Sequence, residues 1–338
     1  MNNMIKIAAI GVSHWHSIFD SAYLSRLSNF DDVSLIAIQD NSQEILDNRR
    51  LQLGSEIQAF TDYTDMLDTI SPDLVIALGS HDDMAATANF LVQRNLPFLM
   101  EKPMSFSAKE LKPLVSKVAD ADAFATVPLH SRFTKFVSLA KELSITKEYG
   151  NLTHFYSRLN RPTSARYPRW GADWMLDPKR SNGGCLRNLG NHGLDVFCYL
   201  TGSGDKVEVT GANFSWGTLN EKVEDYASVM VKNDSGVIGT IETGNCYPGD
   251  GTDGEWKAGF ENALLLEKEN RLLLITSEGT TEIDTGVKDP VLPMLSDVFK
   301  NLRSGTNPTV TVEDCYHAVR LIDLAYIHAG NPYGTASI

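Results

Sequence analysis

The chain has 338 residues, enough for two domains of ordinary size or one large domain. Hydrophobic residues make up 42% of it and charged residues 22%, which is typical of a globular protein and argues against disorder or a coiled coil. Its formal net charge of -13 repels phosphate backbones and anionic lipids, so we expect no nucleic-acid partner and no membrane partner.

The cysteines and the apolar segments favour a cytoplasmic protein. The four cysteines lie far apart and form no Cys-x-x-Cys pair, which indicates buried thiols in a reducing compartment (Cys185, Cys198, Cys246 and Cys315). The apolar run at residues 5–10 is too short for a signal peptide. No window holds the roughly 18 consecutive apolar residues that a membrane span needs.

The first third of the chain alternates short apolar segments with helical patterns. The apolar segments are typical of strands buried on both faces (residues 5–10, 33–38, 74–78 and 98–100). The helical patterns fall between them (residues 17–27, 44–53 and 84–94). Strands and helices that alternate in this way predict right-handed βαβ units, and hence an α/β domain with a parallel sheet over residues 1–127.

After about residue 151 the pattern changes to one strand after another. The predicted strands cover residues 152–159, 207–216, 226–232, 236–243, 263–269 and 271–276. Asn233-Asp234-Ser235-Gly236 is typical of a hairpin turn, and residues 311–329 have the spacing of a closing helix. We therefore predict an α+β domain with a largely antiparallel, open sheet over residues 128–338.

The turn after the first strand is a candidate phosphate loop. It reads Gly11-Val12-Ser13-His14-Trp15-His16, which keeps only the first glycine of Gly-x-Gly-x-x-Gly, so an ordinary strand-to-helix turn is the alternative. Asp40 ends the second strand, where a carboxylate would accept hydrogen bonds from an adenosine ribose or would simply form a turn. No arginine follows Asp40 directly, which favours NAD over NADP. These features predict a dinucleotide-binding Rossmann domain.

A lysine follows the strand predicted at residues 98–100. Glu101-Lys102-Pro103 places it at the carboxyl end of a buried strand, where open α/β sheets bind their ligands. A charged loop that merely ends the strand is the alternative.

Two stretches together carry a family resemblance. Glu101-Lys102-Pro103 is the first, and the second runs from Gly183-Gly184 to Gly190-Asn191-His192-Gly193-Leu194-Asp195. In both the chain resembles the glucose–fructose oxidoreductase / inositol dehydrogenase (Gfo/Idh/MocA) family. The resemblance implies an NAD(P)-dependent oxidoreductase that transfers a hydride between the nicotinamide and a sugar, polyol or related small alcohol. It also implies a homodimer or homotetramer formed through the open face of the C-terminal sheet.

The resemblance assigns site residues by position. It implies that Lys102 and His192 are the active-site lysine and histidine, with Asn188 where the family has an acid. The catalytic set is therefore Lys102, His192 and Asn188. The expected cofactor contacts are Gly11, Ser13, His14, Trp15, Asp40, Ser80, His81, Glu101 and Lys102. The expected substrate contacts are Lys102, Arg169, Trp174, Asn188 and His192.

Oxidation of an alcohol requires a base for the hydroxyl proton while the hydride leaves. We assign that role to His192, and expect Lys102 to stabilise the alkoxide or relay the proton. If residues 186–200 form a helix, Asn188, His192 and Asp195 share one face, so Asp195 either holds the imidazole or makes structural contacts.

Several alternatives stay open. The segment 161–174 is rich in Arg, Tyr and Trp, which suits a sugar site or an interface, and Arg132 suits a cleft or a surface. His14, His16 and His81 have no Cys or carboxylate cluster to complete a zinc site, so we expect no metal. The altered turn and Asn188 motivate a second hypothesis, a non-catalytic sensor that binds cofactor or sugar. An NAD-dependent glycosidase is the third.

Overall fold

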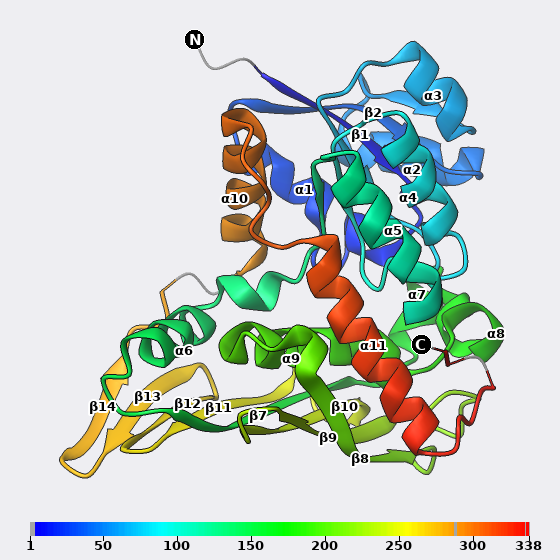
Figure 1. Cartoon of the computed structure of the whole chain (residues 1–338). Helices are drawn as coiled ribbons and strands as arrows, with labels where there is room; N and C mark the ends of the chain where they lie inside the picture. Colours follow the sequence, from blue (N-terminus) through cyan, green and yellow to red (C-terminus); the bar gives the residue numbers. More distant parts are fainter. Residues whose placement is uncertain (1–3, 287–288, 335, 338) are drawn as a thin grey trace.

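The chain folds into two sheets, which the computed structural model describes through residues 4–286, 289–334 and 336–337 (Figure 1). The N-terminal sheet has six strands in the order β3-β2-β1-β4-β5-β6, and every neighbouring pair is parallel. Its strands are β1 (Ile5–Ile10), β2 (Val33–Gln39), β3 (Gln58–Phe60), β4 (Leu74–Ala77), β5 (Phe98–Met100) and β6 (Ala125–Thr126). The predicted parallel α/β sheet is thereby confirmed.

Helices connect the parallel strands as the βαβ pattern requires. They are α2 (Gln43–Leu53), α3 (Tyr63–Thr69), α4 (Met84–Gln93) and α5 (Ala108–Asp120). Side-chain caps start three of them, because Ser42, Asp62 and Ser107 each accept a hydrogen bond from a backbone N–H of the first turn.

The helix predicted at residues 17–27 is wrong as a continuous element. The chain instead forms the short 3-10 helix η1 (Trp15–Ser17), the single turn α1 (Tyr23–Arg26) and the 3-10 helix η2 (Leu27–Asn29). Asp20 and Ala22 have φ angles of 46° and 45°, and a left-handed backbone cannot continue a right-handed helix.

The second sheet has eight strands in the order β14-β13-β12-β11-β7-β10-β9-β8. Only β7 and β10 pair in parallel, so the prediction of a largely antiparallel sheet is confirmed. The strands are β7 (Leu152–Pro162), β8 (Val207–Ser215), β9 (Tyr226–Asn233), β10 (Ile238–Tyr247), β11 (Asp253–Phe260), β12 (Ala263–Lys268), β13 (Arg271–Thr276) and β14 (Gly279–Ile283). The predicted hairpin turn at Asn233 joins β9 to β10.

Three longer helices lie on the side of the second sheet that faces the N-terminal sheet (Figure 1). They are α6 (Lys135–Thr146), α9 (Cys185–Thr201) and α11 (Val312–His328). Helix α9 packs against β10 and β7 and is buried along almost its whole length, so its side chains reach both domains. The short helices α7 (Arg166–Arg169) and α8 (Pro178–Ser181) and the 3-10 helices η3 (His130–Phe133), η4 (Asp173–Leu176) and η5 (Gly204–Lys206) occupy the connections.

Helix α10 (Val291–Ser304), which the sequence patterns did not indicate, returns to the N-terminal sheet (Figure 1). Val291, Leu295 and Phe299 lie in one buried cluster with residues of β1, β2 and β4. The start of α11 likewise joins the core on the other face of that sheet. Residues of α10 and α11, which lie beyond the predicted boundary at residue 127, therefore contribute to the cores on both faces of the N-terminal sheet.

The cysteines and the helix lengths can be compared with the sequence expectations. The cysteines are all free, and Cys185, Cys198 and Cys315 are buried, but Cys246 is only half-buried because it lies near the end of β10. In the part of the chain that the structure describes, every helix is too short or too polar to cross a lipid bilayer.

Candidate active site

Two pockets open beside the carboxyl ends of the parallel strands. The first, which we call the Asp40 pocket, has a volume of about 450 Å³. The second, which we call the Lys102 pocket, has a volume of about 460 Å³. The Asp40 pocket is lined mainly by N-terminal residues, and the Lys102 pocket by residues of both sheets' domains.

The turn after β1 requires its glycine. Gly11 has a φ of +69°, and a Cβ there would lie 2.5 Å from the carbonyl oxygen of Leu78. The N–H groups of Gly11 and Val12 both donate to the carbonyl oxygen of Gln39, at 2.9 and 3.2 Å. The glycine therefore lets the turn lie flat against the ends of β2 and β4.

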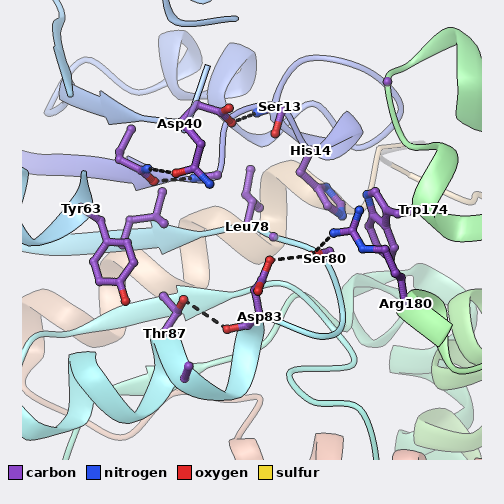
Figure 2. Close-up of a pocket in the computed structure, with 17 residues that line it drawn as sticks. Ser13, His14, Asp40, Tyr63, Leu78, Ser80, Asp83, Thr87, Trp174 and Arg180 are labelled. Carbon is purple, nitrogen blue, oxygen red and sulfur yellow. Dashed lines mark hydrogen bonds between the residues drawn. The ribbon is translucent and has the colours of Figure 1, made fainter. Parts of the chain in front are cut away.

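Asp40 is buried at one end of the pocket and holds this turn. Its Oδ2 accepts the N–H of Ser13 at 2.7 Å (Figure 2). Its Oδ1 accepts the N–H of Ser42 at 3.2 Å. The N–H of His14 donates to the carbonyl oxygen of Gly11. The turn thus satisfies these donors internally, and the three-residue η1 that follows is no long helix with a free N-terminus.

The opposite end of the Asp40 pocket is built from both domains. Arg180 donates to Ser80 Oγ at 3.1 Å, and Ser80 donates to Asp83 at 2.8 Å (Figure 2). Trp174 lies beside them, its ring 5.7 Å from that of Trp15. Trp174, which the sequence assigned to the substrate, therefore lines the pocket that Asp40 and Gly11 also line.

The Asp40 pocket fits an extended dinucleotide. It runs along the carboxyl ends of β2, β1 and β4, where the strand order reverses and open α/β sheets bind nucleotides. Asp40, Asn41 and Tyr63 line one end, and Ser80 and Trp174 the other (Figure 2). Gly11, which has no side chain, lines the pocket between the two ends.

The Lys102 pocket is centred on the lysine that follows β5. Lys102 is 3% exposed, and its Nζ donates to the backbone oxygen of Asn188 at 2.8 Å and to the side-chain oxygen of the same residue. The Asn188 amide nitrogen donates to Tyr167 Oη at 2.7 Å. Burial lowers the pKa of Lys102, although Glu101, 3.7 Å away, opposes that shift. The structure thus brings Lys102 and Asn188 together as the sequence assignment implies.

His16 is part of the same buried network. Its Nδ1 lies 3.1 Å from a Glu101 oxygen and its Nε2 lies 3.5 Å from Asp20. Burial alone would lower the pKa of His16, but the two carboxylates together raise it. The sequence indicated His16 only as part of the turn and as a metal candidate, because Glu101, its partner in space, lies far from it along the chain.

His192 faces His130, with 4.6 Å between the ring centroids. Burial lowers the pKa of both imidazoles, that of His130 to about 4. Asp195 does not hold His192, because both of its oxygens accept hydrogen bonds from Arg132. Asp195 therefore makes structural contacts and does not hold the imidazole. Its partner Arg132 is buried rather than at the surface.

The remaining predicted site residues are distributed unevenly. Gly11, Ser13, His14, Asp40 and Ser80 line the Asp40 pocket, whereas Trp15 lines the Lys102 pocket. Glu101 lies behind Lys102 and lines neither pocket, and His81 is buried with its Nδ1 2.8 Å from the Ser181 carbonyl oxygen. Arg169 is exposed and outside both linings. Among the described residues, no three His, Cys, Asp or Glu side chains gather as a metal site.

Comparison with family models gives matches to both halves of the chain. Residues 5–128 match a model described as "Oxidoreductase family, NAD-binding Rossmann fold". Residues 137–281 match the GFO/IDH/MocA C-terminal domain. The two matches together span most of the chain and both belong to one family.

Three individual proteins illustrate the similarity. The chain is 24% identical to a glucose-6-phosphate 3-dehydrogenase of Bacillus subtilis (strain 168), over 67% of this chain and 64% of that protein. It is 23% identical to a myo-inositol 2-dehydrogenase of Thermotoga maritima, over 92% of each chain. Its fold matches a levoglucosan dehydrogenase solved with NADH and levoglucosan, with a TM-score of 0.85, 16% identity and 98% of each chain covered.

Proposed function

Because the chain belongs to the GFO/IDH/MocA family of oxidoreductases, we propose that it oxidises a sugar or polyol hydroxyl in the Lys102 pocket. The family assignment makes the chain an NAD-dependent oxidoreductase. The proposal extends this by placing NAD in the Asp40 pocket and the reacting alcohol beside Lys102. Relatives that act on glucose 6-phosphate and myo-inositol support a polyhydroxylated substrate.

The observation that carries the proposal is the buried Lys102 in the lining of the second pocket. NAD, when bound, accepts the hydride, and a protein group must then take the hydroxyl proton. The lowered pKa of Lys102 moves the amine toward the neutral form that accepts a proton near physiological pH. Burial lowers the pKa of His192 as well, which keeps its imidazole neutral. We therefore give the base role to Lys102, and to His192 that of a neutral imidazole hydrogen-bonded to the hydroxyl.

Asn188 supports this division of roles. Its two oxygens fix the Lys102 ammonium or amine in place without adding a negative charge. A carboxylate in the same position would favour the ammonium and raise the lysine pKa. The amide in place of the acid thus favours a lysine that is ready to accept a proton.

The Asp40 pocket supports NAD rather than NADP. Asp40 places a buried carboxylate where the 2′-phosphate of NADP would lie. The nearby Arg49 donates through Nε to the carbonyl oxygen of Val12 at 2.9 Å and does not line the pocket. Arg180 lines it only at the end near Ser80.

A sensor that binds cofactor without turnover is the second candidate. The internal hydrogen bonds of the Gly11 turn favour it, because Ser13 and His14 do not offer free N–H groups to a pyrophosphate. An NAD-dependent glycosidase, the third candidate, would release product without net NADH. Exchange of solvent deuterium into the product would distinguish it from a dehydrogenase.

Two titrations and one assay test the proposal. Fluorescence titration with NADH and with NADPH should show saturable binding that is tighter for NADH. NADH absorbance should then rise when the protein and NAD meet sugars or polyols from a broad panel. Tight NADH binding without turnover on any of them would favour the sensor, and absence of binding to either nucleotide would refute the cofactor site.

The family resemblance and the composition also support two coarser proposals. A homodimer or homotetramer would use the face of the second sheet opposite α9 (Figure 1). Met230 on β9 is half exposed. A cytoplasmic location agrees with four free cysteines.

A further inference from the structure

Two imidazoles in the Lys102 pocket each have a buried nitrogen with no hydrogen-bond partner among the residues that the structure describes. His130 and His192 both line the pocket, and their rings are 4.6 Å apart at an angle of 41°. The Nδ1 atoms of both are buried and unpaired within the described part of the chain. Buried polar atoms normally have a partner, so an unpaired pair that faces a pocket points to a ligand.

A buried ion pair holds the two rings in this arrangement. Arg132, on the same 3-10 helix as His130, donates to both oxygens of Asp195, which lies one turn after His192 on α9. Arg132 also lies 2.8 Å from Asp314 on α11 and over the ring of Tyr199 at 4.6 Å. The two histidines are therefore fixed to each other through their own helices.

The chemistry of the two rings suits uncharged oxygen ligands. Burial lowers the pKa of both imidazoles, that of His130 to about 4, which favours the neutral rings, and each neutral ring has one hydrogen-bond donor and one acceptor. A hydroxyl group is likewise a donor and an acceptor, so each ring can hold one hydroxyl. Two rings in contact can hold two hydroxyls only if those are close together in the ligand.

The rest of the pocket agrees with an uncharged ring. Trp15, Tyr167 and Trp256 line it, and aromatic faces cover the C–H surfaces of sugars. The arginines at 26 and 161 each pair with a carboxylate, Asp289 at 2.6 Å and Asp20 at 2.9 Å. Those two cations are therefore neutralised within the pocket, and the third arginine that lines it, Arg166, is held by the Pro162 carbonyl oxygen and the Asn245 side-chain oxygen.

We propose that His130 is a second substrate-binding imidazole, and that it and His192 together hold two neighbouring hydroxyls of an uncharged sugar or cyclic polyol. The inference rests on the proposed function, because it concerns the same pocket. It adds a specificity-determining residue, His130, and a substrate feature, the neighbouring pair of hydroxyls.

The test uses the full-length protein and a double comparison of variant and ligand. The probes are glucose, myo-inositol and the single-deoxy derivatives of each. Their binding is measured by the fluorescence of the pocket tryptophans, and their oxidation is measured by the absorbance of NADH. H130F keeps an aromatic ring but removes its nitrogens, and H130Q restores a hydrogen-bonding group. H328F makes the same change at an exposed position at the end of α11 and serves as the control.

We expect H130F to weaken binding of the preferred parent polyol about tenfold, the effect of one neutral hydrogen bond. The deoxy derivative that lacks the hydroxyl held by His130 should bind wild type and H130F equally, and H130Q should recover part of the loss. Equal losses for parent and all deoxy derivatives, or no loss at all, would overturn the inference, as would a wild type that binds neither parent. Binding that depends on His130 without any NADH formation would refute the proposed oxidation and leave the inference standing.

Discussion

At the scale of single residues, the chemistry of the site depends on charges around Lys102. The lysine is buried beside Glu101, and His16 shares the same carboxylate from the other side. The imidazolium of His16 neutralises part of the Glu101 charge, which would otherwise favour the Lys102 ammonium. His16 is thus a positioning residue that acts on Lys102 through Glu101.

The pH dependence of kcat/KM tests this arrangement. Oxidation needs the neutral amine, so the rate should rise with pH as Lys102 loses its proton, at a midpoint below the ordinary lysine pKa of about 10.4. In H16Q, Glu101 retains its full charge, the Lys102 ammonium is stabilised, and the rising limb should move to higher pH. A limb that stays in place, or moves to lower pH, would contradict the role of His16. H328Q provides a control at an exposed position.

At the scale of elements, α9 connects the site to the core of the protein. It carries Asn188, His192 and Asp195 on successive turns, so one helix contacts Lys102, forms the pocket wall and anchors Arg132. Glu224 accepts the N–H groups of Gly184 and Leu186 and so satisfies the first turn of α9. A shift of α9 would therefore move all three site residues together.

Breaking the ion pair between Arg132 and Asp195 should destabilise the protein strongly. D195N leaves the buried Arg132 with only Asp314 as a charged partner, and loss of one member of a buried pair costs about 3–5 kcal/mol. Urea unfolding monitored by circular dichroism measures the free energy of unfolding. E282Q removes the exposed pair with Arg271 and should leave stability unchanged. Equal effects of D195N and E282Q would show that the buried pair does not hold α9 in place.

At the scale of the whole molecule, the C-terminal third completes the N-terminal domain. Helix α10 covers one face of the parallel sheet, and two ion pairs fasten it there, Arg303 with Asp32 and Arg26 with Asp289, each at 2.6 Å. The segment that leads into α10 also forms part of the Lys102 pocket, because Asp289 and Val291 line it.

A fragment ending at residue 127 should consequently fold poorly. It would expose the apolar surface that Leu295 and Phe299 cover in the full chain, and an exposed patch of that kind promotes aggregation. Expression of residues 1–127 alone, compared with the full chain by urea unfolding, measures the effect. A fragment as stable as the intact protein would show that residues 1–127 form an independent domain.

The sequence predicted the sheets better than it predicted the site. Buried strands such as β1 and β5 were found with their exact bounds, because uninterrupted apolar runs mark strands covered on both faces. Helix α10 was missed because its place in the fold depends on packing against the parallel sheet. The pattern at residues 17–27 was mistaken for one helix because left-handed residues interrupt it. Motif position implied that Lys102 and Asn188 belong to one site, whereas the contact between Glu101 and His16 joins residues with no recognisable pattern. The role proposed for His130 likewise depends on His192, which is distant from it in the sequence.

The central claim is that Lys102 takes the proton while NAD takes the hydride, and K102M tests it most directly. Methionine keeps the apolar stem of the lysine but has no amine, so kcat for polyol oxidation should fall about a hundred- to ten-thousand-fold. NADH affinity, measured by fluorescence titration of the same preparation, should stay within about threefold of wild type, since Asp40 and the Gly11 turn are untouched. If K102M instead oxidises the polyol at the wild-type rate, Lys102 is not the base and the proposed mechanism is wrong.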